Sequence, residues 1–322
     1  MPAAPTYTFR MSEQFAQVGE VELCYDQFGE PSGAPLLLIM GLGAPMTAWP
    51  NGFCELLAEH GFFVTRFDNR DIGRSTIMSK AGVPSTASVL AGRRSVAPYR
   101  LSDMAADAAG LLDEIGLGSA HVVGASMGGM ISQVLAIEHP SKVRSLTSIM
   151  STTGRKTAGM PSPNVFRGFV KPPPVGQGIE AEIEHFVGVF RTVGSRGDLW
   201  EEDAIRALAR EALERGSTRS GTIRQLAAIT SASDRTRLLR SLKVPALVIH
   251  GSADRLIHPS GGRATARAIP GSTYMEFSGM GHDLPTPLWR QMASAIAENA
   301  RRAKDGGPQA QTVPLTVSAN AE

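Results

Sequence analysis

The stretch "GASMGG", residues 124–129, decides how this chain folds. It surrounds Ser126 with the smallest side chains available, and Met127 is its only bulky residue. The run "AHVVGAS" (120–126) is typical of a buried strand, and "MGGMISQVLAIEHP" (127–140) is typical of a helix that stops at its proline. A sharp turn between the two lifts a serine hydroxyl above a sheet, and its strained backbone leaves no room for neighbouring side chains. We therefore predict that Ser126 is a nucleophile, and the alternative is a tight turn that happens to contain a serine.

Strands and helices alternate on both sides of this turn. Alternation of this kind predicts a parallel sheet that is covered on both faces. The fold class is therefore α/β, with a mostly parallel, twisted sheet flanked by helices. The expected strands cover residues 21–29, 35–40, 62–68, 120–126, 143–150, 245–251 and 272–279, and the expected helices cover 101–117 (capped by Ser102), 127–140, about 260–269 and about 286–303.

Residues 152–240 interrupt this alternation. The segment begins rich in proline and then becomes helical, with further helices expected at 201–216 and about 220–231. It predicts a helical cap lying over the strand ends, inserted into a core formed by residues 1–151 and 241–303. The last residues, 304–322, lack helical periodicity and are rich in Gly, Pro, Gln and Ser, so we expect a disordered tail. The first cap helix would carry one apolar face, formed by Ile179, Ile183, Phe186, Val187, Phe190 and Val193.

Composition limits the function classes. The 322 residues include 32 Lys and Arg against 30 Asp and Glu, a net charge of +2 without a basic run, so no nucleic-acid partner is expected. The only two cysteines, Cys24 and Cys54, are expected to be buried thiols rather than a disulfide framework. The first residues lack the apolar core of a secretory signal, and no run is long enough to cross a bilayer. These features predict a cytoplasmic protein without a transmembrane segment.

A serine hydroxyl needs a base to become a nucleophile. Among the seven histidines, His282 lies in "GMGHDLP", a glycine-punctuated loop between the last strand and the last helix. From there an imidazole can reach back over the strand ends. His258 is also in a loop and is a weaker candidate. Structural roles are expected for the other five, His60, His121, His139, His185 and His250.

A carboxylate should orient the base. Asp254 lies in "HGSADRLIHP" (250–259), directly after a buried strand. The chain order of Ser126, Asp254 and His282 is the one found in α/β-hydrolases, with each residue following its own strand. Asp283 is the rival carboxylate, and it is expected to point away from the site or to cap the last helix.

The loop "IMGLGAPMTAW" (39–49) follows another buried strand. Its G-x-G suggests a dinucleotide site, but Met46 stands where the fingerprint needs a third glycine. In a hydrolase this loop instead supplies an oxyanion donor, the backbone N–H of Leu42, beside a second donor at Met127. Gly41 would let the chain approach the substrate, and Trp49 is a candidate pocket residue.

From about Val21 to about Asn299 the chain resembles the α/β-hydrolase superfamily. The resemblance is carried by "IMGLGAPMTAW", "RFDNRDIGRS", "VGASMGGMISQ", "LVIHGSADRLIHP" and "GMGHDLP", in this order. Within the superfamily the chain is similar to bacterial carboxylesterases of the aclacinomycin methylesterase type and of the LipG type. The resemblance implies a Ser126 nucleophile, a His282 base and an Asp254 acid. Many relatives carry His-Gly at the oxyanion loop, where this chain has Met40 before its glycine.

The expected function is hydrolysis of a small-molecule carboxylic ester through an acyl-enzyme, with lipid-like esters and thioesters among the candidate substrates. No cofactor is expected, and no metal-ligand spacing such as H-E-x-x-H occurs. Phe186 and Phe190 in the cap are candidate pocket residues for a hydrophobic group, although they could equally pack the cap helices together. Two alternatives stay open: a cofactor-free perhydrolase or carbon–carbon bond hydrolase on the same triad, and a ligand receptor on a hydrolase scaffold that turns over slowly.

Overall fold

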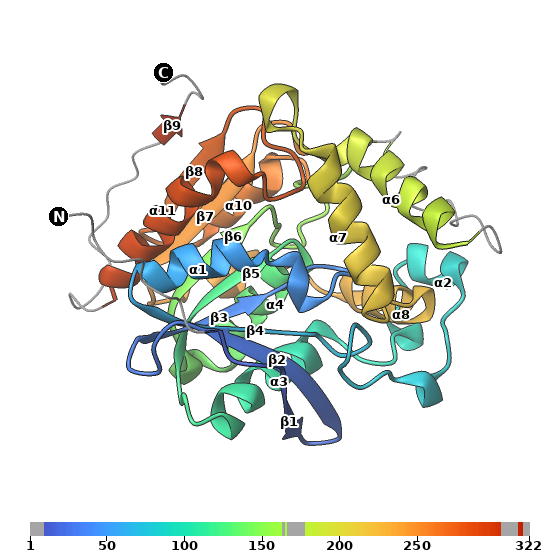
Figure 1. The fold of residues 1–322 in the computed structure, drawn as a ribbon, viewed down its shortest axis with the longest axis horizontal. Helices are drawn as coiled ribbons and strands as arrows, with labels where there is room; N and C mark the ends of the chain where they lie inside the picture. Colours follow the sequence, from blue (N-terminus) through green and yellow to red (C-terminus); the bar gives the residue numbers. More distant parts are fainter. Residues whose placement is uncertain (1–9, 163–164, 166–177, 304–314, 318–322) are drawn as a thin grey trace.

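The computed structural model describes residues 10–162, 165, 178–303 and 315–317. A nine-stranded sheet runs through the molecule with helices on both of its faces (Figure 1). The strand order is β1-β2-β4-β3-β5-β6-β7-β8-β9, and the pairs β1/β2 and β2/β4 are antiparallel while the others are parallel. The strands are β1 (Gln14–Val18), β2 (Val21–Phe28), β3 (Ala34–Ile39), β4 (Phe62–Phe67), β5 (Ala120–Ala125), β6 (Val143–Ile149), β7 (Ala246–Gly251), β8 (Thr273–Phe277) and β9 (Leu315–Val317). The predicted fold class is therefore confirmed.

Helices cover both faces because the central strands are apolar on both sides. In β3, Leu37 and Ile39 belong to one buried cluster, whereas Leu36 and Leu38 belong to the other. This separation follows from the two-residue period of a strand. The first face is covered by α3 (Leu101–Glu114), α4 (Met127–Glu138) and α10 (Ser260–Ala268), and the second by α1 (Asn51–Glu59) and α11 (Trp289–Arg301).

Four helices lie between β6 and β7 in the sequence: α6 (Ile179–Val193), α7 (Glu202–Glu214), α8 (Arg219–Ser231) and α9 (Thr236–Leu239). In Figure 1 the first three lie on the right-hand side of the molecule, with α6 and α7 towards the top and α8 below them at mid-height. A small apolar cluster of its own joins α6 to α7, centred on Ile183, Val187, Ile205 and Ala209. The predicted cap spans residues 152–240, of which 163–164 and 166–177 lie outside the described residues. We use the word cap for residues 178–240, which hold these helices.

Several local expectations differ from the structure. Helix α3 begins at Leu101, so Ser102 lies inside it, and the carboxylate of Asp103 instead accepts from the backbone N–H of Arg100, the cap residue. Strand β1 and the short helix α2 (Thr86–Leu90), which packs beside α8, were not anticipated. Within the predicted disordered tail, 304–322, residues 315–317 form β9 beside β8, and the remainder lies outside the described residues.

Both cysteines are buried free thiols, as expected. Within the described ranges, none of the helices is long and apolar enough to cross a membrane.

Replacing Gly128 by alanine is expected to destabilise the protein. The added Cβ would lie 1.9 Å from the carbonyl oxygen of Ile39 and 2.8 Å from that of Met40, so α4 and β3 would have to separate. We expect a loss of at least about 1–3 kcal/mol in the free energy of unfolding, measured by urea denaturation. Gly188→Ala is the matched control. Apart from its chain neighbours and its own helix backbone, no atom of the described residues lies within 4 Å of the added Cβ, and alanine favours the middle of α6 by about 1 kcal/mol. Similar losses in both variants would contradict this account.

Candidate active site

Ser126 occupies the sharp turn between β5 and α4. Its φ of +56° and ψ of −119° lie in a region that L-residues rarely adopt. Backbone hydrogen bonds fix the turn, because Ser126 donates its N–H to Ile149 (2.9 Å) and accepts from the N–H of Met130 (3.2 Å). Its carbonyl also accepts from Ser151 Oγ at 2.8 Å. The serine hydroxyl is therefore presented by a rigid backbone.

The small residues around Ser126 are required by close packing. A Cβ built on Gly124 would lie 2.2 Å from the carbonyl oxygen of Gly128 and 2.3 Å from Ser132 Oγ. One built on Gly129 would lie 2.6 Å from the Cβ of Ser151. Side chains at these positions would push α4 off the sheet, so the glycines are needed for the turn to form.

Ser126, His282 and Asp254 are brought together by three different loops. His282 Nε2 lies 2.9 Å from Ser126 Oγ, and His282 Nδ1 lies 2.8 Å from Asp254 Oδ2. An ionised carboxylate can only accept, so Nδ1 carries the proton and Nε2 is free to accept from the serine hydroxyl. The arrangement can move a proton from Ser126 to the imidazole.

Asp254 is buried but strongly hydrogen-bonded. Its Oδ1 accepts from the N–H groups of Leu256 and Ile257, both at 2.9 Å. Burial favours the neutral acid, but the charge of His282 and hydrogen bonds from His250 and His282 outweigh it. Together they lower the pKa of Asp254 to about 2, so the carboxylate stays ionised.

His250 is a second histidine beside Asp254 that the sequence did not associate with the site. Its Nε2 lies 2.8 Å from the carbonyl oxygen of Ile257 and 3.4 Å from Asp254 Oδ2. Since both atoms are acceptors, Nε2 carries the proton. The ring is fully buried, and a Cβ on Gly262 would lie 2.4 Å from its Nδ1, so the imidazole has no space to turn. The sequence signal that could have indicated this contact is the position of His250, at the end of a strand and four residues before Asp254.

The loop after β3 lies directly against the serine. A Cβ built on Gly41 would be 3.1 Å from the Cβ of Ser126 and 3.6 Å from its Oγ. Within the described part of the chain, the N–H groups of Leu42 and Met127 have no hydrogen-bond acceptor. Two donors beside a nucleophile can receive an oxyanion.

The same loop is held from the cap and from the stretch "DNRDIGRS" (68–75). Gly43 donates its N–H to Gln225 Oε1 in α8 (2.9 Å), and the Nε2 of this buried glutamine donates to the carbonyl of Arg70 (2.9 Å). Met46 donates its N–H to Asp68 Oδ1 at 2.7 Å. Gln225 lies in a predicted helix, but its contact is 182 residues away in the sequence, so no local pattern indicated it.

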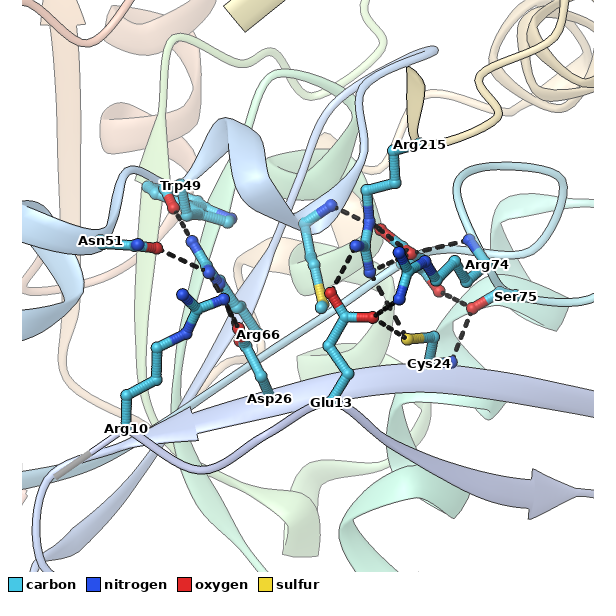
Figure 2. Close-up of polar contacts among 12 residues, drawn as sticks. Arg10, Glu13, Cys24, Asp26, Trp49, Asn51, Arg66, Arg74, Ser75 and Arg215 are labelled. Carbon is cyan, nitrogen blue, oxygen red and sulfur yellow. Dashed lines mark hydrogen bonds and ion pairs between the residues drawn. The ribbon is translucent and has the colours of Figure 1, made fainter. Parts of the chain in front are cut away.

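Arg215 links the end of α7 to this region (Figure 2). Its guanidinium is 2.8 Å from Asp68 Oδ2 and 2.6 Å from Glu13 Oε1, and it contacts Cys24 Sγ at 3.4 Å. Burial and the neighbouring carboxylates of Asp68 and Glu13 raise the pKa of the Cys24 thiol to about 12. The raised pKa favours the protonated thiol, which lies against Arg215 at the end of α7.

The predicted pocket residues other than Gly41 lie in apolar clusters. Trp49 is fully buried and stacks on Phe53, with ring centroids 5.8 Å apart, in the core below α1. Phe186 and Phe190 stack on each other at 4.7 Å and pack against the α6–α7 cluster. Trp49 is therefore a core residue, which corrects its assignment to the pocket surface. Contact of the two phenylalanines with substrate stays a prediction.

Comparisons with known proteins identify the family of this chain. Residues 34–285 match the family described as the alpha/beta hydrolase fold. The chain is 31% identical to rhodomycin D methylesterase DauP of Streptomyces sp. (strain C5) and 30% identical to rhodomycin D methylesterase DnrP of Streptomyces peucetius. Each alignment covers 88% of this chain and 96% of the relative. The enol-lactonase of Burkholderia xenovorans LB400 has the same fold, with a TM-score of 0.66 at 22% identity over 91% of this chain and all of that one.

The lowered pKa of Asp254 predicts how stability changes in acid. The folded-state pKa, about 2, lies below the ordinary value of 3.8, so the carboxylate stabilises the folded state above about pH 4 and loses this effect as the pH falls towards 2. The contribution is about 2 kcal/mol. We expect the difference in unfolding free energy between wild type and Asp254→Asn to shrink by about this amount between pH 5 and pH 2. A pH-independent difference would show that the folded state does not lower this pKa.

Proposed function

The chain belongs to the α/β hydrolase fold family, and we propose that it is a carboxylic ester hydrolase in which Ser126 forms an acyl-enzyme. The observation that carries the proposal is the hydrogen-bonded series from Ser126 through His282 to Asp254, held on a strained turn. The relatives named methylesterases, alike over nearly their whole length, support ester hydrolysis as the reaction.

Acylation begins with proton transfer. His282 Nε2 takes the proton of Ser126 as its Oγ attacks the ester carbonyl, and the ionised Asp254 stabilises the imidazolium that forms. The N–H groups of Leu42 and Met127 donate to the oxyanion. Each such donor typically contributes about 3–4 kcal/mol to stabilisation of the transition state. His282 then protonates the leaving alcohol.

Deacylation uses the same residues, with water in place of Ser126 as the nucleophile and Ser126 as the leaving group. A water molecule gives a proton to His282 Nε2 and attacks the acyl carbonyl. The oxyanion of the second tetrahedral intermediate accepts hydrogen bonds from the same two backbone N–H groups. Collapse returns the proton from the imidazole to Ser126 Oγ and releases the carboxylic acid. No residue beyond the series and the two N–H groups is needed for this cycle.

For the substrate we propose a methyl ester of a hydrophobic acid. The methyl group follows from the relatives, both of which are named for methyl ester cleavage. A hydrophobic acyl part is supported by the apolar surface of α6, where Phe186 and Phe190 are only partly buried.

Ser126→Ala tests the acyl-enzyme. Wild type is expected to bind a fluorophosphonate at one equivalent per chain and to hydrolyse p-nitrophenyl esters, and the variant should lose labelling and about six orders of magnitude in turnover. Mass spectrometry and absorbance measure the two effects. Ser272→Ala is the control, because its hydroxyl donates to the carbonyl of Ala266 away from the site and both activities should persist. A series of methyl to butyl esters of one aromatic acid then tests the alcohol preference.

Each other outcome contradicts part of the proposal. Labelling without ester turnover would keep Ser126 as an activated nucleophile but reject ester hydrolysis. Halogenation with peroxide and acetate would then favour the perhydrolase. Tight binding with very slow turnover would favour the receptor. No labelling of wild type would reject the nucleophile itself.

The pH dependence tests the base. kcat/KM for ester hydrolysis is expected to rise as the pH increases from the acid side, because His282 must be neutral to accept the serine proton. Because the pKa of Asp254 is about 2, this carboxyl group is already ionised above about pH 3 and does not contribute to the rise in kcat/KM there. A profile that is flat from mildly acidic to mildly alkaline pH would exclude His282 as the base.

A further inference from the structure

We propose that Ser195 and Asp283 form a buried clamp through which the cap positions His282 for catalysis. The inference rests on the proposed function, since it concerns the base of that reaction. Ser195 follows the end of α6, and Asp283 is the residue directly after His282. Asp283 had been expected to point away from the site or to cap the last helix, and in the structure it contacts the cap.

The clamp is made of well-formed hydrogen bonds. Ser195 Oγ donates to Asp283 Oδ1 at 2.5 Å, and the Ser195 N–H lies 3.1 and 3.0 Å from the two carboxylate oxygens. The hydroxyl also accepts from the N–H of Gly281 at 3.0 Å. One serine therefore holds the residues on both sides of His282.

Backbone contacts extend the clamp along the loop. His282 donates its N–H to the carbonyl of Val193 at 2.8 Å, and Arg196 donates to the carbonyl of Gly279 at 2.8 Å. A Cβ on Gly281 would lie 2.0 Å from the carbonyl carbon of Gly194, so the two backbones touch. The histidine loop has no room to move towards the cap while these contacts exist.

Burial makes the clamp strong and specific. Ser195 and Asp283 are 1% and 8% exposed. Burial raises the pKa of Asp283, and its hydrogen bonds with Ser195 oppose this rise. Removing the hydroxyl would leave the buried Gly281 N–H without its acceptor and would leave Asp283 Oδ1 with only the longer contact to the Ser195 N–H, so the loop would be expected to shift. Because a displacement of about 1 Å at a reacting group can reduce a rate about 100-fold, a small shift of His282 would be measurable.

The geometry assigns a positioning role to Ser195, so its loss should lower kcat rather than substrate binding. For Ser195→Ala we expect kcat per fluorophosphonate-titrated site to fall about 10- to 100-fold with KM nearly unchanged, and the labelling rate constant to fall in parallel. Ser195→Thr keeps the hydroxyl and should recover most of the rate. Asp283→Asn should fall in the same range as Ser195→Ala, since it weakens the same contact.

Ser231→Ala is the matched control. Ser231 is also a buried cap serine, but its hydroxyl donates only to the carbonyl of Ala228 in its own helix. Titrating active sites removes the effect of misfolded protein from each rate.

The outcomes separate this inference from the function on which it rests. Wild-type turnover per site in Ser195→Ala, or a raised KM with unchanged kcat, would overturn the clamp while leaving the ester hydrolase intact. A double variant Ser195→Ala/Asp283→Asn that multiplies the two single losses would show that the residues act independently, which also overturns it. Wild type that neither labels nor hydrolyses esters would instead overturn the proposed function, and the clamp with it.

Discussion

The strained backbone of Ser126 is the constraint on which the rest of the site depends. Holding a non-glycine residue at a φ of +56° costs on the order of 1–3 kcal/mol, so the conformation persists only where its surroundings leave no alternative. Gly124 and Gly128 supply those surroundings, because they allow α4 to meet β5 and β3 backbone to backbone. Met150, at the end of the neighbouring strand β6, also has a positive φ, of 42°. Asp71, in the loop after β4, is the third described non-glycine residue with a positive φ, of 75°. Backbone strain therefore lies in segments that follow the carboxyl ends of three strands.

The cap acts on this site from two directions. Gln225 in α8 accepts from Gly43, next to a proposed oxyanion donor, and Ser195 at the end of α6 holds the loop of His282. The loop of the proposed donor Leu42 and the loop of the proposed base His282 are thus each held by a cap residue. A cap that only covered the substrate would not need hydrogen bonds to the loops that carry reacting groups. These contacts join the packing of the cap to the geometry of the proposed site.

The features that the sequence predicted well are those encoded locally. Alternating apolar runs predict the parallel strands, and small residues around one serine predict the turn that carries it. The meeting of Ser126, Asp254 and His282 in space could be inferred because each residue follows a parallel strand, and parallel strands bring their carboxyl ends to one edge of the sheet. Gln225 and Ser195 could not be found in this way, since both act through hydrogen bonds to residues more than 80 positions away. Trp49 was misassigned because an aromatic residue after a loop looks the same in sequence whether it faces a ligand or the core.

Charge explains why the parts of the cap are held with different strength. Arg224 in α8 is fully buried and makes a two-pronged contact with Asp71, which also accepts from the hydroxyl of Tyr99. Arg215 is similarly enclosed by Asp68 and Glu13. Separating either ion pair would leave an unpaired charge in the protein interior, which is costly, so α8 and the end of α7 stay docked.

Helix α6 is attached differently. The ion pairs between α6 and α7, among them Arg191 with Glu202, are exposed to solvent and screened, so these ion pairs contribute little to holding α6. The apolar cluster joins α6 to α7, whereas the buried contacts of residues 193–196 join the end of α6 directly to the histidine loop. These contacts are the direct route by which a displacement of that end would reach His282.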